Sequence, residues 1–323
     1  MSYLGLYHYG LYFLATAGIF GILALGLNLQ WGLSGVFNLG IAGFFAIGAY
    51  ASALLTGAPD PGHWGGFSLP LPVGAIAAMI ISGAVALVIG AATIRLRSDY
   101  LAIATLGIAE IIRLVIKNTG DLTGGVRGIA GIPSPFHADS QLVLLIVVLA
   151  VIVVLYWLVE RARVSPWGRV LRGIRENEDA AMAAGKYVTR FRLEAFVVGS
   201  AFMGLGGALY ASSIGFISPE AFRPEYGTFL IWVMLIAGGS GNNVGVLVGT
   251  FLVWLVWSFS SLLTDLLPGG LATQAGAVRI FLIGLLLQVI LLVRPEGLFP
   301  EKSPRLIGRP RTDAESRHTP DES

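Results

Sequence analysis

The chain contains 323 residues, of which 55% are hydrophobic and 12% are charged, and its formal net charge is +2. Because soluble domains carry about 25% charged residues, this composition excludes a soluble globular protein and predicts an all-α, polytopic membrane protein. The net charge by itself says little because the charges are segregated along the chain, and no continuous basic surface indicates nucleic-acid binding. The absence of Cys excludes disulfides, thiolate metal sites and Cys nucleophiles.

The apolar runs predict the transmembrane helices, since a spanning helix needs roughly 20 mostly apolar residues. About nine helices are predicted, within a range of eight to ten, at residues 11–29, 36–55, 71–94, 100–116, 142–159, 193–214, 227–237, 244–263 and 277–293. The run at 100–116 is polar at one end. The run at 227–237 is short and continues into the Gly- and Asn-rich residues 238–243, so a broken or re-entrant segment is predicted there.

Positive charge is segregated along the chain. Residues 1–94 contain no Lys or Arg, whereas residues 160–192, the basic loop, contain eight of the 21. Because Lys and Arg that flank membrane spans stay on the cytoplasmic side, the basic loop is predicted to be cytoplasmic. Counting spans from this loop places the C-terminus inside as well and the N-terminus outside. The chain is therefore divided into a transmembrane domain at 1–299 and a disordered cytoplasmic tail at 300–323.

Two short helices are predicted within the basic loop. Ser165 and Pro166 form a typical helix start, and apolar side chains follow at positions 167, 170, 171 and 174, which predicts an amphipathic helix along the membrane surface. An Ala-rich stretch comes next, with Glu178 and Asp179 early and Gly185 placed as the terminator. This second helix is smooth enough to enter a groove on a partner; the alternative is a loop helix without a partner.

The sequence Asp179-Ala180-Ala181-x-x-x-Gly185 resembles the EAA-type loop of ABC importer permeases, with Asp179 in place of the Glu that usually begins the pattern. In that family the loop forms the coupling helix that docks on the ATP-hydrolysing subunit. The resemblance therefore implies an ATPase-coupling loop made of Glu178, Asp179, Ala180, Ala181 and Gly185.

Stretches at residues 26–50, 95–113, 122–129, 218–222 and 294–299 resemble the permease subunit of branched-chain amino-acid ABC importers, the LivM type. The resemblance extends over about residues 25–299. It implies a permease of the bacterial inner membrane that carries branched-chain or other hydrophobic amino acids inward by alternating access. The implied partners are a second homologous permease subunit, two cytoplasmic ATPase subunits, an external substrate-binding protein and membrane lipid. Related permeases carry urea or short amides, so this cargo stays an alternative.

The sequence contains no recognisable motif for nucleotide binding, metal binding or catalysis. A phosphate-binding loop of the type G-x-x-x-x-G-K-[ST] does not occur, so ATP hydrolysis is expected on another chain. The four His residues are scattered and predict no metal site, and no catalytic set or cofactor motif occurs, so the chain is not expected to be an enzyme. One alternative is an ATPase-independent secondary transporter, which would need its own coupling charges in the membrane. Another is a scaffold whose basic loop recruits anionic lipid.

Polar residues within the apolar runs are candidates for the translocation pathway. An ionisable group at the centre of a span costs about 2.5–3.5 kcal/mol, so Glu110 predicts either a pathway residue or an ion pair with Arg113. Thr105 lies on roughly the same helical face. Asn28 and Asn38 flank a Gly-rich break, where they bind a ligand or, alternatively, cap interrupted helices.

Overall fold

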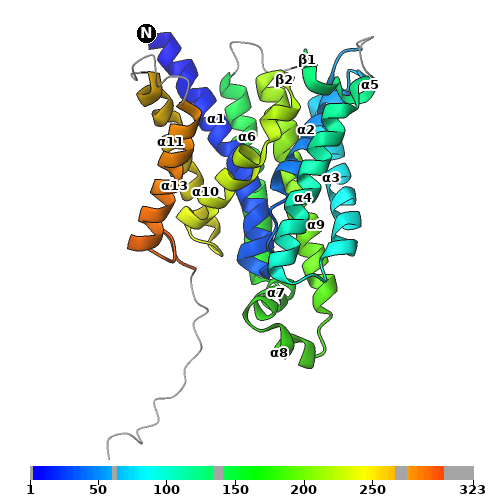
Figure 1. Cartoon of the computed structure of the whole chain (residues 1–323), viewed down its shortest axis with the longest axis vertical. Helices are drawn as coiled ribbons and strands as arrows, with labels where there is room; N and C mark the ends of the chain where they lie inside the picture. Colours follow the sequence, from blue (N-terminus) through cyan, green and yellow to red (C-terminus); the bar gives the residue numbers. More distant parts are fainter. Residues whose placement is uncertain (1–2, 60–63, 134–140, 266–274, 302–323) are drawn as a thin grey trace, which may run out of the picture.

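The computed structural model describes residues 3–59, 64–133, 141–265 and 275–301. Its main helices are α1 (Tyr3–Leu27), α2 (Ile41–Thr56), α3 (Leu71–Thr93), α4 (Ser98–Asn118), α6 (Gln141–Val164), α9 (Val188–Ile214), α10 (Leu230–Gly238), α11 (Asn243–Asp265) and α13 (Ala275–Val293). Each of the nine predicted segments overlaps one of these helices, and the fold is that of a polytopic helical membrane protein (Figure 1). By length and apolar composition, six of the described helices are able to cross a membrane: α1, α3, α6, α9, α11 and α13.

Short elements lie at the two ends of the bundle. At the end that holds the N-terminus, α5 (Gly120–Thr123) and η2 (Gly125–Arg127) lead into β1 (Ile129–Ala130), which pairs antiparallel with β2 (Phe216–Ile217) (Figure 1). At the opposite end lie α7 (Pro166–Glu176) and α8 (Glu178–Ala183). The N-terminus and the basic loop are therefore at opposite ends, as the span count predicts. The predicted disordered tail lies, from residue 302 onward, outside the described residues.

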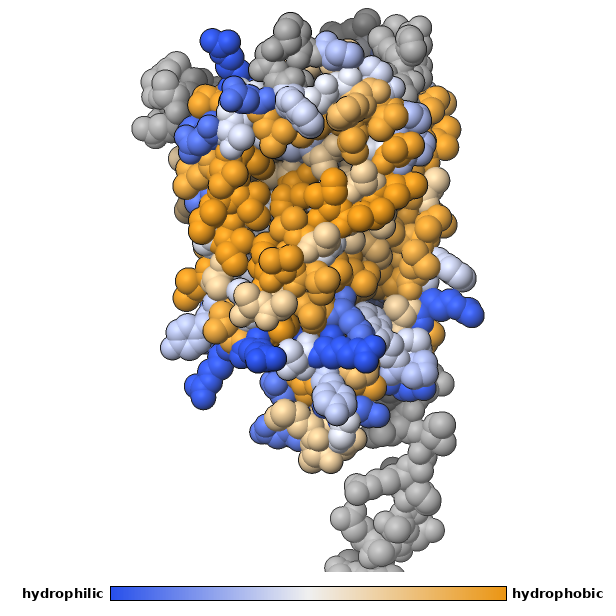
Figure 2. All heavy atoms as spheres, turned by 90° about the vertical axis from the view of Figure 1, so that its right-hand side faces the viewer, coloured by the Kyte–Doolittle hydropathy of each residue, from blue (hydrophilic) through white to orange (hydrophobic). Residues whose placement is uncertain are grey.

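A broad apolar belt surrounds the bundle between its polar ends. Figure 2 shows this belt on the side formed by α3 and α4, where Ile80, Val88 and Ile103 are exposed. Exposed apolar side chains over so large an area would be unstable in water but match the hydrocarbon of a bilayer. The belt is the structural counterpart of the apolar runs in the sequence.

Helix α9 is the packing centre, with α1, α2 and α3 against it. Gly48 of α2 and Gly204 of α9 meet so closely that a Cβ added to Gly48 would overlap the backbone of Gly204. In a membrane, where apolar lipid competes with apolar side chains, such close backbone approach is a main source of helix association. Small residues therefore fix how α2 lies across α9.

Two of the membrane segments are broken. Helix α1 continues into a π-helical turn, η1 (Asn28–Leu33), and residues 35–40 are non-helical before α2 begins at Ile41. The second break precedes α10, where η4 (Pro219–Phe222) and a π-helical turn, η5 (Glu225–Phe229), replace regular helix. The segment predicted at 227–237 is short, as expected: η5 and α10 form one helix over 225–238, which ends at the Gly- and Asn-rich turn that follows. The span predicted from residue 36 begins five residues later, because the backbone of the preceding residues binds other elements, as described below.

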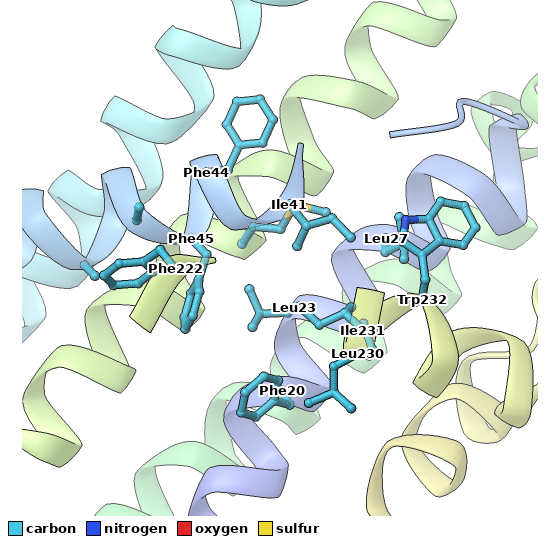
Figure 3. Packing of buried hydrophobic residues seen from close by; sticks show 14 of the residues in the cluster. Phe20, Leu23, Leu27, Ile41, Phe44, Phe45, Phe222, Leu230, Ile231 and Trp232 are labelled. Atoms are coloured by element: carbon cyan, nitrogen blue, oxygen red, sulfur yellow. The ribbon is translucent and has the colours of Figure 1, made fainter. Parts of the chain in front are cut away.

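The two breaks meet in the interior of the bundle. Figure 3 shows Leu23 and Leu27 of α1, Ile41 of α2, and Ile231 and Trp232 of α10 packed together there. These side chains are buried. The irregular backbone is therefore enclosed by protein, which is the condition for non-helical chain at membrane depth.

Candidate functional site

The non-helical segment between η1 and α2 is held by side chains from other elements. A buried backbone group outside a helix needs a partner, because leaving it unsatisfied in the membrane costs several kcal/mol. Thr105 of α4 accepts at Oγ1 from the amide of Leu39 (3.0 Å), and Thr228 of η5 donates to the carbonyl of Leu39 (3.2 Å). Trp232 of α10 donates from Nε1 to the carbonyl of Asn38 (3.0 Å). Three elements therefore stabilise one break.

Gln30 of η1 connects this break to α9. Its Nε2 donates to the carbonyl of Phe196 (2.8 Å) and to Oγ of Ser200 (3.1 Å). Its Oε1 accepts from Nδ2 of Asn38 (2.9 Å), while Oδ1 of Asn38 accepts from the amide of Gly40 (2.7 Å), just before α2 begins. The buried polar side chains around the break are called the central polar network: Gln30, Asn38, Thr105, Ser200 and Thr228.

The central polar network consists of neutral amides and hydroxyls. These groups can donate to a carboxylate and accept from an ammonium, so they suit a zwitterionic ligand without burying a net charge. In this conformation each of the five side chains has a hydrogen-bond partner within the protein. A ligand could therefore bind there only after the break re-packs.

Asn28 joins the first break to the Gly-rich turn after α10. Its Oδ1 accepts from the amide of Gly241 (2.8 Å), and its Nδ2 donates to Oδ1 of Asn243 (2.8 Å). Asn243 also donates from Nδ2 to Glu160 (2.9 Å), near the end of α6. Asn28 is fully buried, yet none of these partners belongs to the central polar network. It caps a turn that is distant in sequence, close to the basic loop.

Glu110 lies in an ion-pair cluster between α4 and η4. Its carboxylate is 2.6 Å from the guanidinium of Arg113, and Arg113 is also 3.4 Å from Glu220. Lys117 is 3.2 Å from the same Glu220. Hydrogen bonds from Lys117 and Arg223 hold the pKa of Glu220 below its usual range, so its carboxylate stays ionised at neutral pH. Glu110 thus forms the ion pair that its spacing from Arg113 allows.

Helix α7 begins as its sequence predicts and is attached to the first break. The Oγ of Ser165 accepts from the amide of Gly168 (3.3 Å), and Ile174 on the apolar face is fully buried. Near its end, Arg175 donates to the carbonyl of Gly32 in η1 and lies 2.6 Å from the carboxylate of Glu301. A displacement of α7 would therefore act directly on η1.

Helix α8 lies farther from the bundle than α7 (Figure 1). Its Glu178 forms an ion pair with Arg192 of α9 (2.8 Å), while Asp179 and Ala180 are exposed and Ala181 is half-buried. Gly185 follows the helix in the left-handed conformation, with φ +74°, and a Cβ added there would meet open space. This is a typical glycine terminator. The exposed part of the helix therefore combines the small side chains of Ala180 and Ala183 with the apolar side chain of Met182, which is 50% exposed.

The sequence profile of the family described as "Branched-chain amino acid transport system / permease component" matches residues 9–291. The chain belongs to this permease family. The high-affinity branched-chain amino acid transport system permease protein LivM of Salmonella typhimurium is 32% identical over 315 residues, covering 89% of this chain and 69% of the relative. LivM of Escherichia coli is 31% identical with the same coverage, and a probable LivM of Methanocaldococcus jannaschii is 30% identical over 322 residues, covering 88% and 91%. No solved structure matches the chain significantly.

The four pathway candidates of this permease are not gathered in one place. Asn38 and Thr105 meet at the first break, whereas Asn28 caps the turn near the basic loop and Glu110 lies in the ion-pair cluster. The members of the central polar network that sequence reasoning missed are Gln30, Ser200 and Thr228. A Gln within an apolar run, eight residues before Asn38, was a usable signal for Gln30. Ser200 and Thr228 carry no such signal in the sequence, because single hydroxyl side chains are common in membrane helices.

Replacement of Glu110 by Gln is expected to change transport by the permease more than its abundance. The pair with Arg113 is partly exposed, and such pairs contribute only about 0–1 kcal/mol. Arg113 also keeps Glu220 as a partner. Immunoblots of membranes and initial uptake rates measure the two effects, with Asp99→Asn, an exposed carboxylate on the same helix, as control. Equal losses of uptake and abundance would assign Glu110 a structural role only.

Proposed function

We propose that this chain is the membrane-spanning subunit of an ATP-driven importer that carries branched-chain or other hydrophobic amino acids into the cytoplasm. Two relatives bear the description of high-affinity branched-chain amino acid transport system permease proteins. The observation that carries the proposal is α8, which projects from the bundle on the basic loop and exposes Ala180, Ala183 and the apolar side chain of Met182. A short projecting helix of this kind suits a groove on a separate energy-supplying subunit.

The basic loop is proposed to face the cytoplasm of a bacterial inner membrane, because Lys and Arg are retained on that side. The segment of Glu178, Asp179, Ala180, Ala181 and Gly185 then docks on one of two cytoplasmic ATPase subunits. A second homologous permease subunit completes the membrane assembly. An external substrate-binding protein delivers cargo at the opposite end of the bundle, where the N-terminus lies.

The structure offers a mechanical route from this docking helix to the bundle interior. Helix α8 follows α7 after the single residue Asn177, and α7 is bound through Arg175 to Gly32 in η1. From η1, Gln30 reaches Asn38 and α9. Closure of the ATPase pair would move α8 and α7 together and re-pack the first break, which is the step that alternating access requires.

A secondary transporter without an ATPase is less well supported by the same structure. Proton coupling needs a titratable group where cargo binds, and the central polar network contains only amides and hydroxyls. The pair of Glu110 and Arg113 lies in a separate, partly exposed cluster. A permease for urea or short amides would fit the neutral network equally well. The family description favours branched-chain amino acids over these alternatives.

The test is to isolate the tagged chain from its native membrane at natural abundance and to identify the proteins that remain bound. We expect an ATPase to co-purify, and we expect proteoliposomes of the intact assembly to accumulate labelled leucine only with ATP present. Unlabelled isoleucine and valine should compete with leucine, whereas urea and acetamide should not. Accumulation of leucine by the chain alone, without ATP, would contradict the proposal.

A further inference from the structure

Four aromatic side chains pack against one another in the half of the bundle opposite α7 and α8. The ring centroid of Phe222 in η4 lies 5.1 Å from Phe45, 5.9 Å from Tyr50 and 6.3 Å from Tyr210. The group of Phe45, Tyr50, Tyr210 and Phe222 is called the aromatic cluster; Figure 3 shows Phe222 beside Phe45. Phe222 is only 1% exposed, although η4 is a single short turn and not part of a spanning helix.

The segment that carries Phe222 is held by contacts with other elements at both ends. Before Phe222, Glu220 is ion-paired with Arg113 and Lys117 of α4, and its side chain is 37% exposed. After it, Thr228 binds Leu39 in the first break. Exposed ion pairs contribute little to stability, so the contacts of Glu220 are the ones that can break first. Movement of η4 away from the bundle would remove Phe222 from the aromatic cluster. Through Thr228 it would also displace the central polar network.

One polar group in the aromatic cluster has no hydrogen bond. The hydroxyl of Tyr50 is buried, and the described residues provide no partner for it. A buried hydroxyl without a partner destabilises the folded protein, so this position requires an explanation. A bound molecule with a carboxylate or ammonium group would supply the missing partner.

We propose that Phe222 is a movable plug, and that the aliphatic side chain of the cargo takes its place between Phe45, Tyr50 and Tyr210 when η4 withdraws. This inference rests on the proposed function. The vacated space would be walled by aromatic rings and would be about the size of a leucine or isoleucine side chain. The Tyr50 hydroxyl would bind the polar end of the cargo. The plug would therefore close the path in this conformation and set the preference for branched aliphatic side chains.

The absence of Cys in the chain allows a direct test with a single introduced thiol. Tyr50→Cys, in the full transporter in its membrane, would be labelled by a membrane-impermeant maleimide applied on the side of the N-terminus. We expect slow labelling with Phe222 in place and labelling about tenfold faster with Phe222→Ala, because removal of the ring opens the path. Because Tyr50→Cys removes the hydroxyl proposed to bind the polar end of the cargo, leucine is used at millimolar concentration. It should still slow the faster reaction through the contact of its aliphatic side chain with Phe45 and Tyr210, and glutamate should not.

Two further variants separate a plug from an ordinary core residue. Glu220→Gln leaves the ring intact and weakens only the surface ion pairs, so faster labelling is expected if η4 moves. Phe44→Ala removes a buried ring outside the aromatic cluster, and labelling should stay slow. Unchanged labelling in Phe222→Ala, or fast labelling that leucine does not slow, would overturn the inference. Leucine protection without ATP-dependent uptake would support the plug while contradicting the proposed function.

Discussion

The Gly185→Trp variant is expected to insert normally but to lose leucine uptake and ATPase association. Gly185 ends α8 with φ +74°, and no atom lies within 4 Å of the Cβ that a side chain would add. The indole would therefore project from the surface proposed to enter the ATPase groove, and the bundle would be untouched. Co-purification of the ATPase and uptake at matched abundance measure the effect, for which we expect a loss of at least about tenfold, since a large ring at the centre of a docking surface prevents close contact.

Two control variants separate the docking surface from the backbone of the turn. A non-Gly residue with positive φ costs about 1–2 kcal/mol, but Asn adopts this conformation more readily than other residues. Gly185→Asn should therefore retain most of the uptake. Gly173→Trp places the same large ring on α7, where a Cβ also meets open space, and uptake should be close to normal. Normal uptake in Gly185→Trp would refute the coupling role of the loop.

The features that follow from local sequence were predictable. The apolar runs predicted each main helix, because a membrane span requires little beyond sufficient length and hydrophobicity. The start of α7 at Ser165 and Pro166 follows from capping chemistry within one turn, and the end of α8 before Gly185 follows from the same rules. The pair of Glu110 and Arg113 is also local, at three residues' separation.

The interior of the site was predictable only in part, because its partners are far apart in the chain. Gln30 and Ser200 are 170 residues apart, and Ala42 and Thr228 are 186 apart. No period or spacing links such residues before the helices pack. Trp232 illustrates the same limit: its indole is buried and donates to the backbone of Asn38, which is 194 residues away in the chain.

The breaks illustrate how distant contacts change a local prediction. Residues 36–55 read as one apolar span, yet α2 begins only at Ile41. The amides of Leu39 and Ala42 donate to the hydroxyls of Thr105 and Thr228, so they are not available for helical hydrogen bonds. Tertiary hydrogen bonds have replaced helical ones, which is tolerated in a membrane when every freed group finds a partner.

The Gln30→Leu variant is expected to lose uptake almost completely and to lose about 1–3 kcal/mol of stability. Without the amide, the hydroxyl of Ser200 can turn to the carbonyl of Phe196, four residues earlier in α9, so these two groups satisfy each other. Nδ2 of Asn38 has no such substitute and stays buried without a partner. The first break would then lose its defined geometry. Thermal unfolding of the purified protein and uptake per folded molecule are the two measurements.

Gln288→Leu is the matched control, because Gln288 lies exposed on α13 and the same side-chain change there should alter neither quantity. The ratio of the two losses in Gln30→Leu is the decisive observation. If stability falls while uptake per folded molecule is preserved, Gln30 is only a packing element. If uptake is lost although the folded fraction is nearly normal, the break between η1 and α2 takes part in transport. The second result is expected, because Gln30 is the residue through which η1, and with it α7, reaches both Asn38 and α9.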